Sequence, residues 1–446
     1  MYKKAIMMFT RDLRLVDNTA LNSIQAQQVI PIFIFNPKQI EQKNNPYFGS
    51  HVVQFMLESL NDLDEQLQKH KSKLHFFYGE PTTILQELIR KHTINAIYIN
   101  KDYTPFSQKR EHDIHALCQK ENVAFHSYDD TLLHPPGTIL KQDRTPYTVF
   151  TPFYKYASTL QIKYPHPNQK IPFSTIESQE KEKLFSQILP EPKKLAIKGG
   201  RTHAKKQLQF IKELSNYKQD RDALDKQGTT YLSAYHKFGT ISVRETLQAC
   251  QGNEPLIRQL FWRDFFYHIA FHFPHVFQHA FQKKYTDISW ENNKNYFEKW
   301  CAGKTGFPII DAAMNQLNQT GYMHNRARMI VASFLTKDLL IDWRWGEKYF
   351  AQTLIDYDPC VNNGSWQWAA STGCDAQPYF RIFNPWLQQE KFDPECTYIK
   401  KWLPELQNYN PKQIHQHQKI PLTNYPEPIV DHYEQKNKAL ALFKKA

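Results

Sequence analysis

Short apolar runs alternate with longer amphipathic stretches near the start of the chain, and this restricts the fold more than any other sequence feature. The runs at 5–9, 29–35, 74–78, 96–100 and 123–128 predict buried strands, and the patterns at 51–68 and 82–91 predict helices. Such alternation is typical of a doubly wound parallel sheet, so we predict an α/β domain over residues 1–130. The first strand is not followed by Gly-x-Gly-x-x-Gly, which excludes a dinucleotide-binding fingerprint there.

The residue pattern changes twice in the rest of the chain. Residues 131–199 are rich in proline with little periodicity, and we predict a connector between domains. Residues 200–446 carry helical patterns, and we predict an all-helical domain there. The helices are expected at 202–215, 242–250, 254–273, 307–320, 324–340, 345–355 and after Pro359. Ser242 and Glu245 form a capping box at the start of the second helix.

The charge of the chain favours a polyanionic partner. The 56 Lys and Arg residues outnumber the 44 Asp and Glu residues, giving a formal net charge of +12. The apolar runs are shorter than the roughly 18 residues of a membrane span, so no membrane association is expected. The 6 cysteines show no metal-ligand spacing and do not suggest a disulfide framework. We therefore expect a soluble, cytoplasmic protein.

All 9 tryptophans lie between Trp262 and Trp402, among several polar clusters. In the helix after Pro359, Asn362 and Trp366 share a face, while Trp368 is about 200° from Trp366 around the axis. These indoles could be core residues or could serve two cavities.

In a second cluster, Asn325, Arg328 and Met329 share one helix face, and Arg328 could pair with Asp356 or Asp358. In a third, Gln259 and Trp262 lie one helical turn apart. In a fourth, the hydroxyls of 228–233 precede a helix, where they could bind a phosphate or form an ordinary cap.

Together these clusters resemble the photolyase/cryptochrome family, and most closely its class I cyclobutane pyrimidine dimer photolyases. The resemblance extends from Phe9 to Val430 and is densest at 262–406, with long signatures at 303–314, 362–372 and 378–385. It implies an antenna-binding α/β domain, a helical domain that binds FAD and DNA, and light-driven repair of pyrimidine dimers in DNA. It implies no metal.

The resemblance also assigns roles to residues by position. The positions that bind FAD are Tyr217, Thr229, Thr230, Tyr231, Leu232, Ser233, Asn325, Arg328, Asp356, Tyr357, Asp358 and Asn362, with Asn362 facing flavin N5. The positions of the electron-transfer chain are Trp366, Trp343 and Trp290. The positions that contact the lesion or DNA are Arg221, Gln259, Trp262, Arg263, Asn325, Arg326, Met329, Trp368 and Gln388.

The chemistry of dimer splitting fits these residue types. The reaction delivers one electron and takes it back, so the cofactor performs the chemistry and the protein supplies position and electrostatics. A damaged pair must leave the base stack, and flat indoles offer it a stacking surface.

Some positions depart from the class I pattern. Gln259 stands where class I enzymes have Glu, and Gln there is also found in six-four photolyases. Tyr322 replaces an expected Trp beside the flavin, and Leu256 replaces another aromatic residue. Asn325 and Met329 occupy the positions of a His pair in the six-four group, which favours cyclobutane dimer repair.

Two further questions stay open on the sequence. The antenna could be deazaflavin or folate, or could be absent, since Gln108 stands roughly where folate-binding members have a Glu and the matching Lys is not found. A cryptochrome-type photoreceptor is the non-enzymatic alternative. We expect a monomer that needs no protein partner.

Overall fold

The computed structural model describes residues 1–162 and 170–445, which divide into two compact units. The first unit comprises the described residues of 1–193 together with 197–215 and 230–272. The second comprises 194–196, 216–229 and 273–445. Among the described residues, no helix is both long enough and apolar enough to cross a membrane. The domain limits given above stay predictions that limited proteolysis would test.

The first unit is built on a parallel five-stranded sheet in the order β3-β2-β1-β4-β5. The strands are β1 (Tyr2–Met8), β2 (Ala26–Phe35), β3 (His75–Tyr78), β4 (Ala96–Asn100) and β5 (Ala124–Tyr128). Every residue of β4 is buried, as expected for a central strand covered on both faces. The predicted fold class is confirmed, and each strand lies within four residues of its predicted limits.

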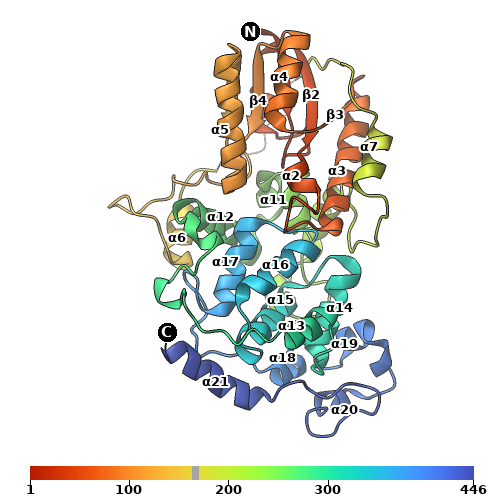
Figure 1. Ribbon diagram of the computed structural model, residues 1–446, viewed down its shortest axis with the longest axis vertical. Helices are drawn as coiled ribbons and strands as arrows, with labels where there is room; N and C mark the ends of the chain where they lie inside the picture. Colours follow the sequence, from red (N-terminus) through yellow and green to blue (C-terminus); the bar gives the residue numbers. More distant parts are fainter. Residues whose placement is uncertain (163–169, 446) are drawn as a thin grey trace. The chain divides into compact units, whose positions relative to one another are not determined.

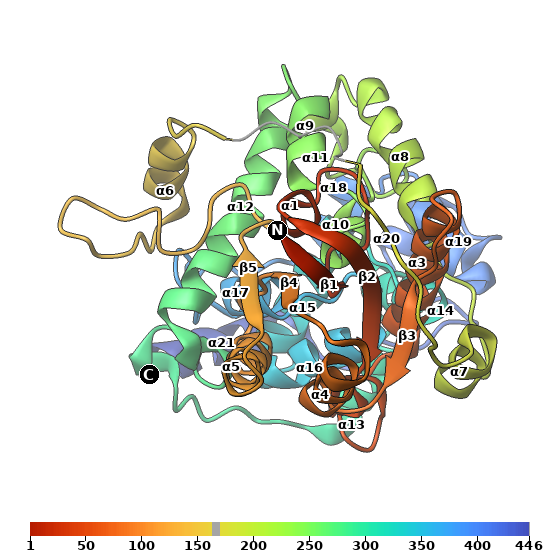
Figure 2. The ribbon, with the colours of Figure 1, turned by 90° about the horizontal axis from the view of Figure 1, so that it is seen from above.

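Helices complete the crossovers between the strands. They are α1 (Thr19–Asn22), α2 (Pro37–Ile40), α3 (Ser50–Gln68), α4 (Pro81–His92) and α5 (Pro105–Lys120). Leu85 and Leu88 of α4 and Ile114 of α5 pack in one core with Ile6 and Ile97 of the sheet. Figure 2 shows α4 and α5 together along one side of the sheet. The sequence did not predict α5, because it buries few residues and is mostly polar.

The rest of the described first unit consists of helices and the loops that join them (Figure 1). It contains α6 (Phe150–Ala157), α7 (Lys181–Ile188), α8 (Arg201–Phe210), α10 (Ser233–Phe238), α11 (Val243–Ala249) and α12 (Glu254–His272). The capping box is confirmed: Ser242 Oγ accepts from the Glu245 N–H at 3.0 Å, and Glu245 accepts from the Ser242 N–H at 3.0 Å. The stretch at 131–199, expected to be irregular, includes α6 and α7.

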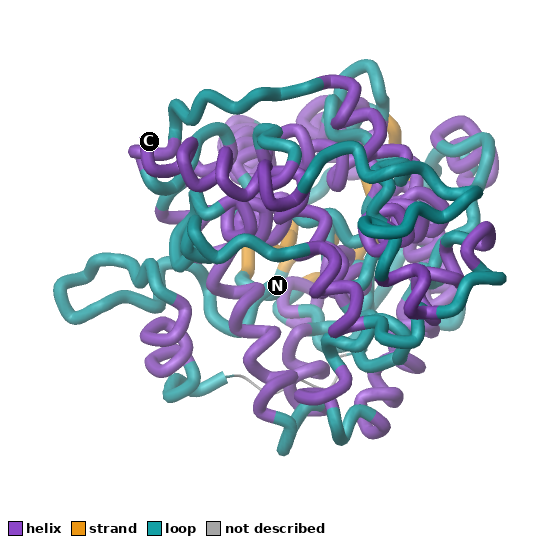
Figure 3. Tube along the Cα trace, turned by 90° about the horizontal axis from the view of Figure 1, so that it is seen from below, coloured by secondary structure: helices purple, strands orange, loops and turns teal. Residues whose placement is uncertain are grey.

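The second unit consists of helices and loops (Figure 3). Its helices are α9 (Tyr217–Asp220), α13 (Lys294–Ala302), α14 (Pro308–Thr320), α15 (Asn325–Ser333), α16 (Trp343–Thr353), α17 (Pro359–Ala370), α18 (Pro385–Phe392), α19 (Thr397–Trp402), α20 (Pro411–His415) and α21 (His432–Lys445). The predicted helix at 324–340 is α-helical only to Ser333 and continues as a π-helical turn, Phe334–Asp338.

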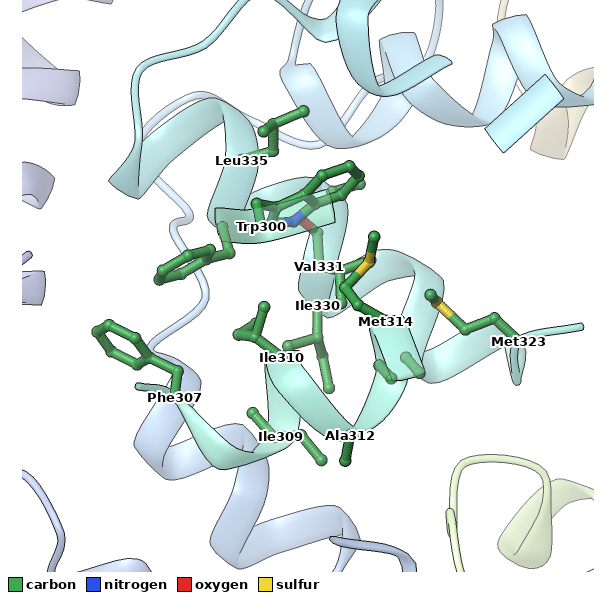
Figure 4. Close-up of a cluster of buried hydrophobic side chains, with 14 of the residues drawn as sticks. Trp300, Phe307, Ile309, Ile310, Ala312, Met314, Met323, Ile330, Val331 and Leu335 are labelled. Carbon is green, nitrogen blue, oxygen red and sulfur yellow. The ribbon is translucent and has the colours of Figure 1, made fainter. Parts of the chain in front are cut away.

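The core of the second unit is rich in aromatic and aliphatic side chains. Trp300, Met314 and Val331 lie in one buried cluster from α13, α14 and α15 (Figure 4). Trp343 and Trp366 belong to the same cluster, with exposures of 3% and 2%. Two of the predicted electron-transfer indoles are therefore core residues in the structure.

Candidate functional site

Arg328 and Asp356 form a bidentate ion pair in the second unit. Nη1 and Nη2 of Arg328 donate to the two carboxylate oxygens at 3.1 and 2.9 Å, and Nε donates to the Met323 carbonyl at 2.8 Å. Burial acts against the Arg328 charge, but Asp356 outweighs it and raises the Arg328 pKa. The sequence left Asp356 and Asp358 as alternative partners, and the structure assigns Asp356.

Asp358 instead caps helix α17. Its Oδ1 accepts from the N–H groups of Cys360 at 3.1 Å and Val361 at 3.3 Å, and Pro359 occupies the first helical position. A carboxylate at this position satisfies unpaired helix donors and complements the positive end of the helix dipole. Asp358 thereby fixes the start of the helix that carries Asn362 and Trp366.

The Asn362 side chain is held by the neighbouring helix. Its Nδ2 donates to the Glu347 carbonyl on α16 at 3.1 Å. The adjacent Asn363 donates to Glu347 Oε1 at 3.2 Å and to the Val276 carbonyl at 2.9 Å. Burial raises the pKa of Glu347 to about 7. The ionisable carboxyl group of Glu347 therefore contacts α17 at Asn363, next to Asn362.

The three predicted electron-transfer indoles differ in burial. Trp366 lies on the same face of α17 as Asn362 and is buried, as is Trp343 at the start of α16. Trp290 is partly buried, and its ring meets that of Phe443 edge-on, with centroids 5.7 Å apart. The three indoles thus range from buried to partly exposed, and the electron-transfer chain that they would form stays a prediction.

Tyr217 is buried and its ring faces Arg221, and Tyr357 packs against the main core of the second unit. Trp368 packs against the same core while remaining half-buried. Nearby in sequence, Gln388 on α18 has a buried Oε1 with no hydrogen-bond partner among the described residues. This acceptor is therefore open to a donor that does not belong to the described residues.

Charged residues of the second unit cluster around Asp222. Arg326 Nη2 lies 2.8 Å from Asp222 Oδ2, and Arg221 Nε lies 3.8 Å from Asp222 Oδ1. On the same helix as Arg326, the Nδ2 atom of the exposed Asn325 lies 3.7 Å from Met329 Sδ. The structure thus brings Arg221 and Arg326, both predicted DNA contacts, to one carboxylate.

Helix α12 of the first unit carries the predicted lesion residues Gln259, Trp262 and Arg263. Gln259 Nε2 donates to the Pro255 carbonyl at 3.2 Å, and Arg263 Nη1 donates to the Thr131 carbonyl at 2.7 Å. The Trp262 ring stacks on Phe150 of α6, with centroids 3.6 Å apart and planes 8° apart. The sequence did not single out Phe150, because only the tertiary fold brings it to Trp262.

The segment 228–233 forms a tight turn before α10. Gly228 lacks room for a side chain, since a Cβ there would lie 2.4 Å from the Asp220 carbonyl oxygen. Tyr231 has a φ of 53°, and the Leu232 N–H donates to Thr230 Oγ1 at 3.3 Å just before Ser233 opens the helix. Thr229 Oγ1 is buried with no partner among the described residues. An unpartnered hydroxyl beside a tight turn fits a group with phosphate and hydroxyl oxygens, such as FAD.

The comparisons with known proteins decide the family. Residues 5–172 match the family described as DNA photolyase, and residues 256–445 match the FAD binding domain of DNA photolyase. This chain belongs to the DNA photolyase family. It therefore carries the FAD-binding domain of that family, as the sequence predicted.

Relatives of this DNA photolyase family member match it over nearly their full length. A deoxyribodipyrimidine photo-lyase of Alkalihalophilus pseudofirmus is 37% identical over 98% of this chain and 97% of its own. The archaeal photolyase of Sulfolobus tokodaii, solved with two FAD molecules, is 42% identical with a TM-score of 0.91 and covers 99% and 100% of the two chains. A class III photolyase of Agrobacterium tumefaciens is 32% identical with a TM-score of 0.92 and covers 100% and 98%.

Proposed function

We propose that this protein is a deoxyribodipyrimidine photo-lyase, which uses light to split cyclobutane pyrimidine dimers in DNA. The observation that supports this proposal most strongly is the match to photo-lyases over nearly the whole chain, including both family domains. Asn325 and Met329, which stand where the six-four group has a His pair, favour the cyclobutane lesion. The net charge of +12 suits a DNA substrate.

The residues that would hold FAD come from the predicted set. Thr229 offers an unpartnered hydroxyl for the phosphate or ribityl end, and Arg328, fixed by Asp356, offers positive charge near the flavin. We assign the cofactor positions to Tyr217, Thr229, Thr230, Tyr231, Leu232, Ser233, Asn325, Arg328, Asp356, Tyr357, Asp358 and Asn362. When bound, reduced FAD supplies the electron that splits the dimer and takes it back afterwards.

Asn362 has the chemistry that a position facing flavin N5 requires. A carboxamide both donates and accepts hydrogen bonds, so it adapts to a ring nitrogen that gains or loses a proton. The bond from Asn362 Nδ2 to the Glu347 carbonyl uses one of the two amide hydrogens, so the other hydrogen and Oδ1 remain for the flavin. Trp366, one turn further along the same face, would pass on, one at a time, the electrons that convert oxidised FAD to its reduced form.

The lesion side would be formed by flat rings and hydrogen-bonding side chains. Trp262 and Trp368 offer stacking faces, and Gln259 and Met329 flank the bases. Arg221, Arg263, Arg326 and Gln388 complete the predicted contacts to DNA. The Arg263 guanidinium binds the Thr131 carbonyl, so Arg263 would act mainly by holding α12 in position.

The deciding experiment is repair of defined lesions by the purified protein carrying reduced FAD. We expect light-dependent loss of cyclobutane dimers and no loss in the dark. Repair of six-four products alone would overturn the class assignment. Light-driven flavin chemistry without repair of either lesion would favour a cryptochrome-type receptor.

The absorption spectrum of the same preparation tests the antenna. A band besides that of FAD would identify a deazaflavin or folate, and a second bound FAD would resemble the Sulfolobus structure, which was solved with two FAD molecules. Sedimentation of the same sample tests the proposed monomer, and cell fractionation tests the proposed cytoplasmic location.

A further inference from the structure

Helix α6 packs beside helix α12 in the first unit (Figure 1). On α12, Glu254, Arg258 and Trp262 follow one another at intervals of four residues and therefore share one helix face. On α6, Phe150 and Tyr154 are also four residues apart. These two rows of side chains contact each other from Tyr154 and Glu254 at one end to Phe150 and Trp262 at the other. Helix α6 thus supports the face of α12 that carries Trp262.

Polar contacts hold the α6 rings against α12. The Tyr154 hydroxyl donates a hydrogen bond to Glu254 Oε1. The guanidinium carbon of Arg258 lies 4.7 Å from the ring centroid of Tyr154 and 5.4 Å from that of Phe150, which is the range of a cation–π interaction. The position of Phe150 on α12 is therefore fixed by neighbours other than Trp262.

Phe150 covers one face of the Trp262 indole. The ring centroids are 3.6 Å apart and the planes 8° apart, so the two rings overlap face to face. Phe265 meets the indole edge-on at 5.8 Å, and Phe266 lies tilted to it at 5.7 Å. Phe150 is only 1% exposed, whereas Trp262 is half-buried. The exposed part of Trp262 therefore lies away from the face that Phe150 covers.

The overlap of Phe150 and Trp262 is not the geometry that two aromatic rings choose by themselves. Isolated pairs favour offset or edge-to-face arrangements with centroids about 4.5–7 Å apart over full face-to-face overlap. The two rings here are closer than that range and nearly parallel. The packing of α6 on α12 therefore imposes the overlap, and the indole has no room to tilt toward Phe150.

A fixed indole favours stacking of a base that has left the duplex. A tryptophan side chain that is free to rotate loses conformational entropy when a base stacks on it, and this loss weakens binding. Because Phe150 already restricts the Trp262 ring in the folded protein, little of that entropy remains to be lost when the base arrives. Only the indole face opposite Phe150 is left for stacking.

We propose that Phe150 is a positioning residue for lesion recognition. Its ring holds the Trp262 indole in one orientation and leaves the opposite indole face to stack on a base of the flipped pyrimidine dimer. Phe150 is buried, so it acts through the indole and not on the base itself. The proposal rests on the proposed function, in which Trp262 stacks on the damaged bases.

The test is binding in the dark of the FAD-loaded protein to dimer-containing DNA and to undamaged DNA of the same sequence. Phe150→Leu removes the ring and keeps an apolar side chain. It should weaken binding to dimer-containing DNA by about threefold to tenfold, the entropy of one side chain that is no longer held. Binding to undamaged DNA should not change, because no base leaves the stack to reach Trp262.

Phe153→Leu is the matched control for damage to the fold. Phe153 lies on the same helix, is also 1% exposed, and its ring contacts on α12 are Phe265 and His268. The same substitution should therefore lower the thermal stability about as much as Phe150→Leu does, without changing the preference for dimer-containing DNA. An equal loss of that preference in Phe153→Leu would show that loosening of α6, and not the Phe150 ring, is responsible, which would overturn the proposal.

A double-variant cycle with Trp262→Leu shows whether Phe150 acts through the indole. Trp262→Leu should lose most of the preference for dimer-containing DNA, and adding Phe150→Leu should change the remaining affinity by less than about twofold. Losses that simply multiply, or a Phe150→Leu variant that binds dimers as the wild type does, would overturn the positioning role alone. If the wild type repairs dimers but Trp262→Leu keeps its preference, the role of Trp262 fails first. A wild type that repairs no cyclobutane dimer overturns the proposed function, and the positioning role with it.

Discussion

Gly346 lies directly against the ring of Trp366. A Cβ at Gly346 would lie 2.2 Å from Cη2 and 2.5 Å from Cζ3 of the indole, and 2.6 Å from Leu335 Cδ2. No side chain fits there without moving the ring, because core packing leaves little room to adjust. The absence of a side chain at Gly346 therefore sets where Trp366 lies.

Gly346→Ala should displace Trp366 and destabilise the fold. Overpacking should cost about 1–3 kcal/mol, although alanine favours a helix more than glycine does. Photoreduction should also slow. The double variant Gly346→Ala/Trp366→Phe should recover part of the lost stability, since phenylalanine lacks the two clashing indole atoms while the contact with Leu335 Cδ2 remains. Chemical unfolding of the wild type, the two single variants and the double variant measures the coupling between the two positions. If the changes in unfolding free energy simply add, the two residues do not interact.

Asp222→Asn should strengthen binding to dimer-containing DNA. Asp222 neutralises Arg326 and lies beside Arg221, so losing its charge releases both guanidinium groups to phosphates. We expect an affinity gain of about two- to fivefold at low salt and a steeper salt dependence. Arg326→Ala should have the opposite effect, on undamaged DNA as well.

The control for charge alone is Glu298→Gln, an exposed position on α13 that also removes one negative charge. Titrations at several salt concentrations compare the three variants. Equal gains for Asp222→Asn and Glu298→Gln would show that net charge, not this arginine pair, governs binding.

Glu347→Gln should stabilise the protein at neutral and alkaline pH. Burial raises the pKa of Glu347 from 4.5 to about 7, so the folded protein binds this proton more tightly than the unfolded chain does. That contribution is complete below about pH 4.5 and is lost as the pH rises through 7. Glutamine can still accept the bond from Asn363 but never becomes charged.

The stability difference between Glu347→Gln and wild type should therefore grow from near zero at low pH to about 1–3 kcal/mol at pH 8. Urea unfolding across this range measures it, with Glu298→Gln as the exposed control. A difference that does not depend on pH would mean that Glu347 ionises as a solvent-exposed carboxyl does.

Gln259→Ala should weaken lesion binding by about 1–3 kcal/mol, because it leaves polar groups of the bases unpaired. A Gln carboxamide can accept from a thymine N3–H and donate to O4, whereas a Glu can do both only when protonated. Gln259→Glu should therefore bind dimers less well as the pH rises, unlike the wild type. Dark binding assays at several pH values measure this, and an unaffected Gln259→Ala variant would remove the residue from the site.

The features that the sequence determined are local. Each strand of the sheet is a short, mostly apolar run, and β4 matches its predicted limits because four apolar residues in a row, ending at Asn100, mark a strand buried on both faces. Ser242 and Glu245 contact within one helical turn, so their capping box needs no distant residue. The same holds for the shared face of Asn362 and Trp366, which follows from helical geometry alone.

The tertiary structure decided between partners of equal chemistry. Asp356 and Asp358 are both carboxylates, and only the path of the chain before α17 turns the first toward Arg328 and the second onto the helix end. Phe150 reaches Trp262, and Trp300 reaches Trp366, across long sequence separations that no periodicity encodes. Burial, contact distance and the free energy of an ion pair depend on those long-range positions, which the sequence specifies only through the whole fold.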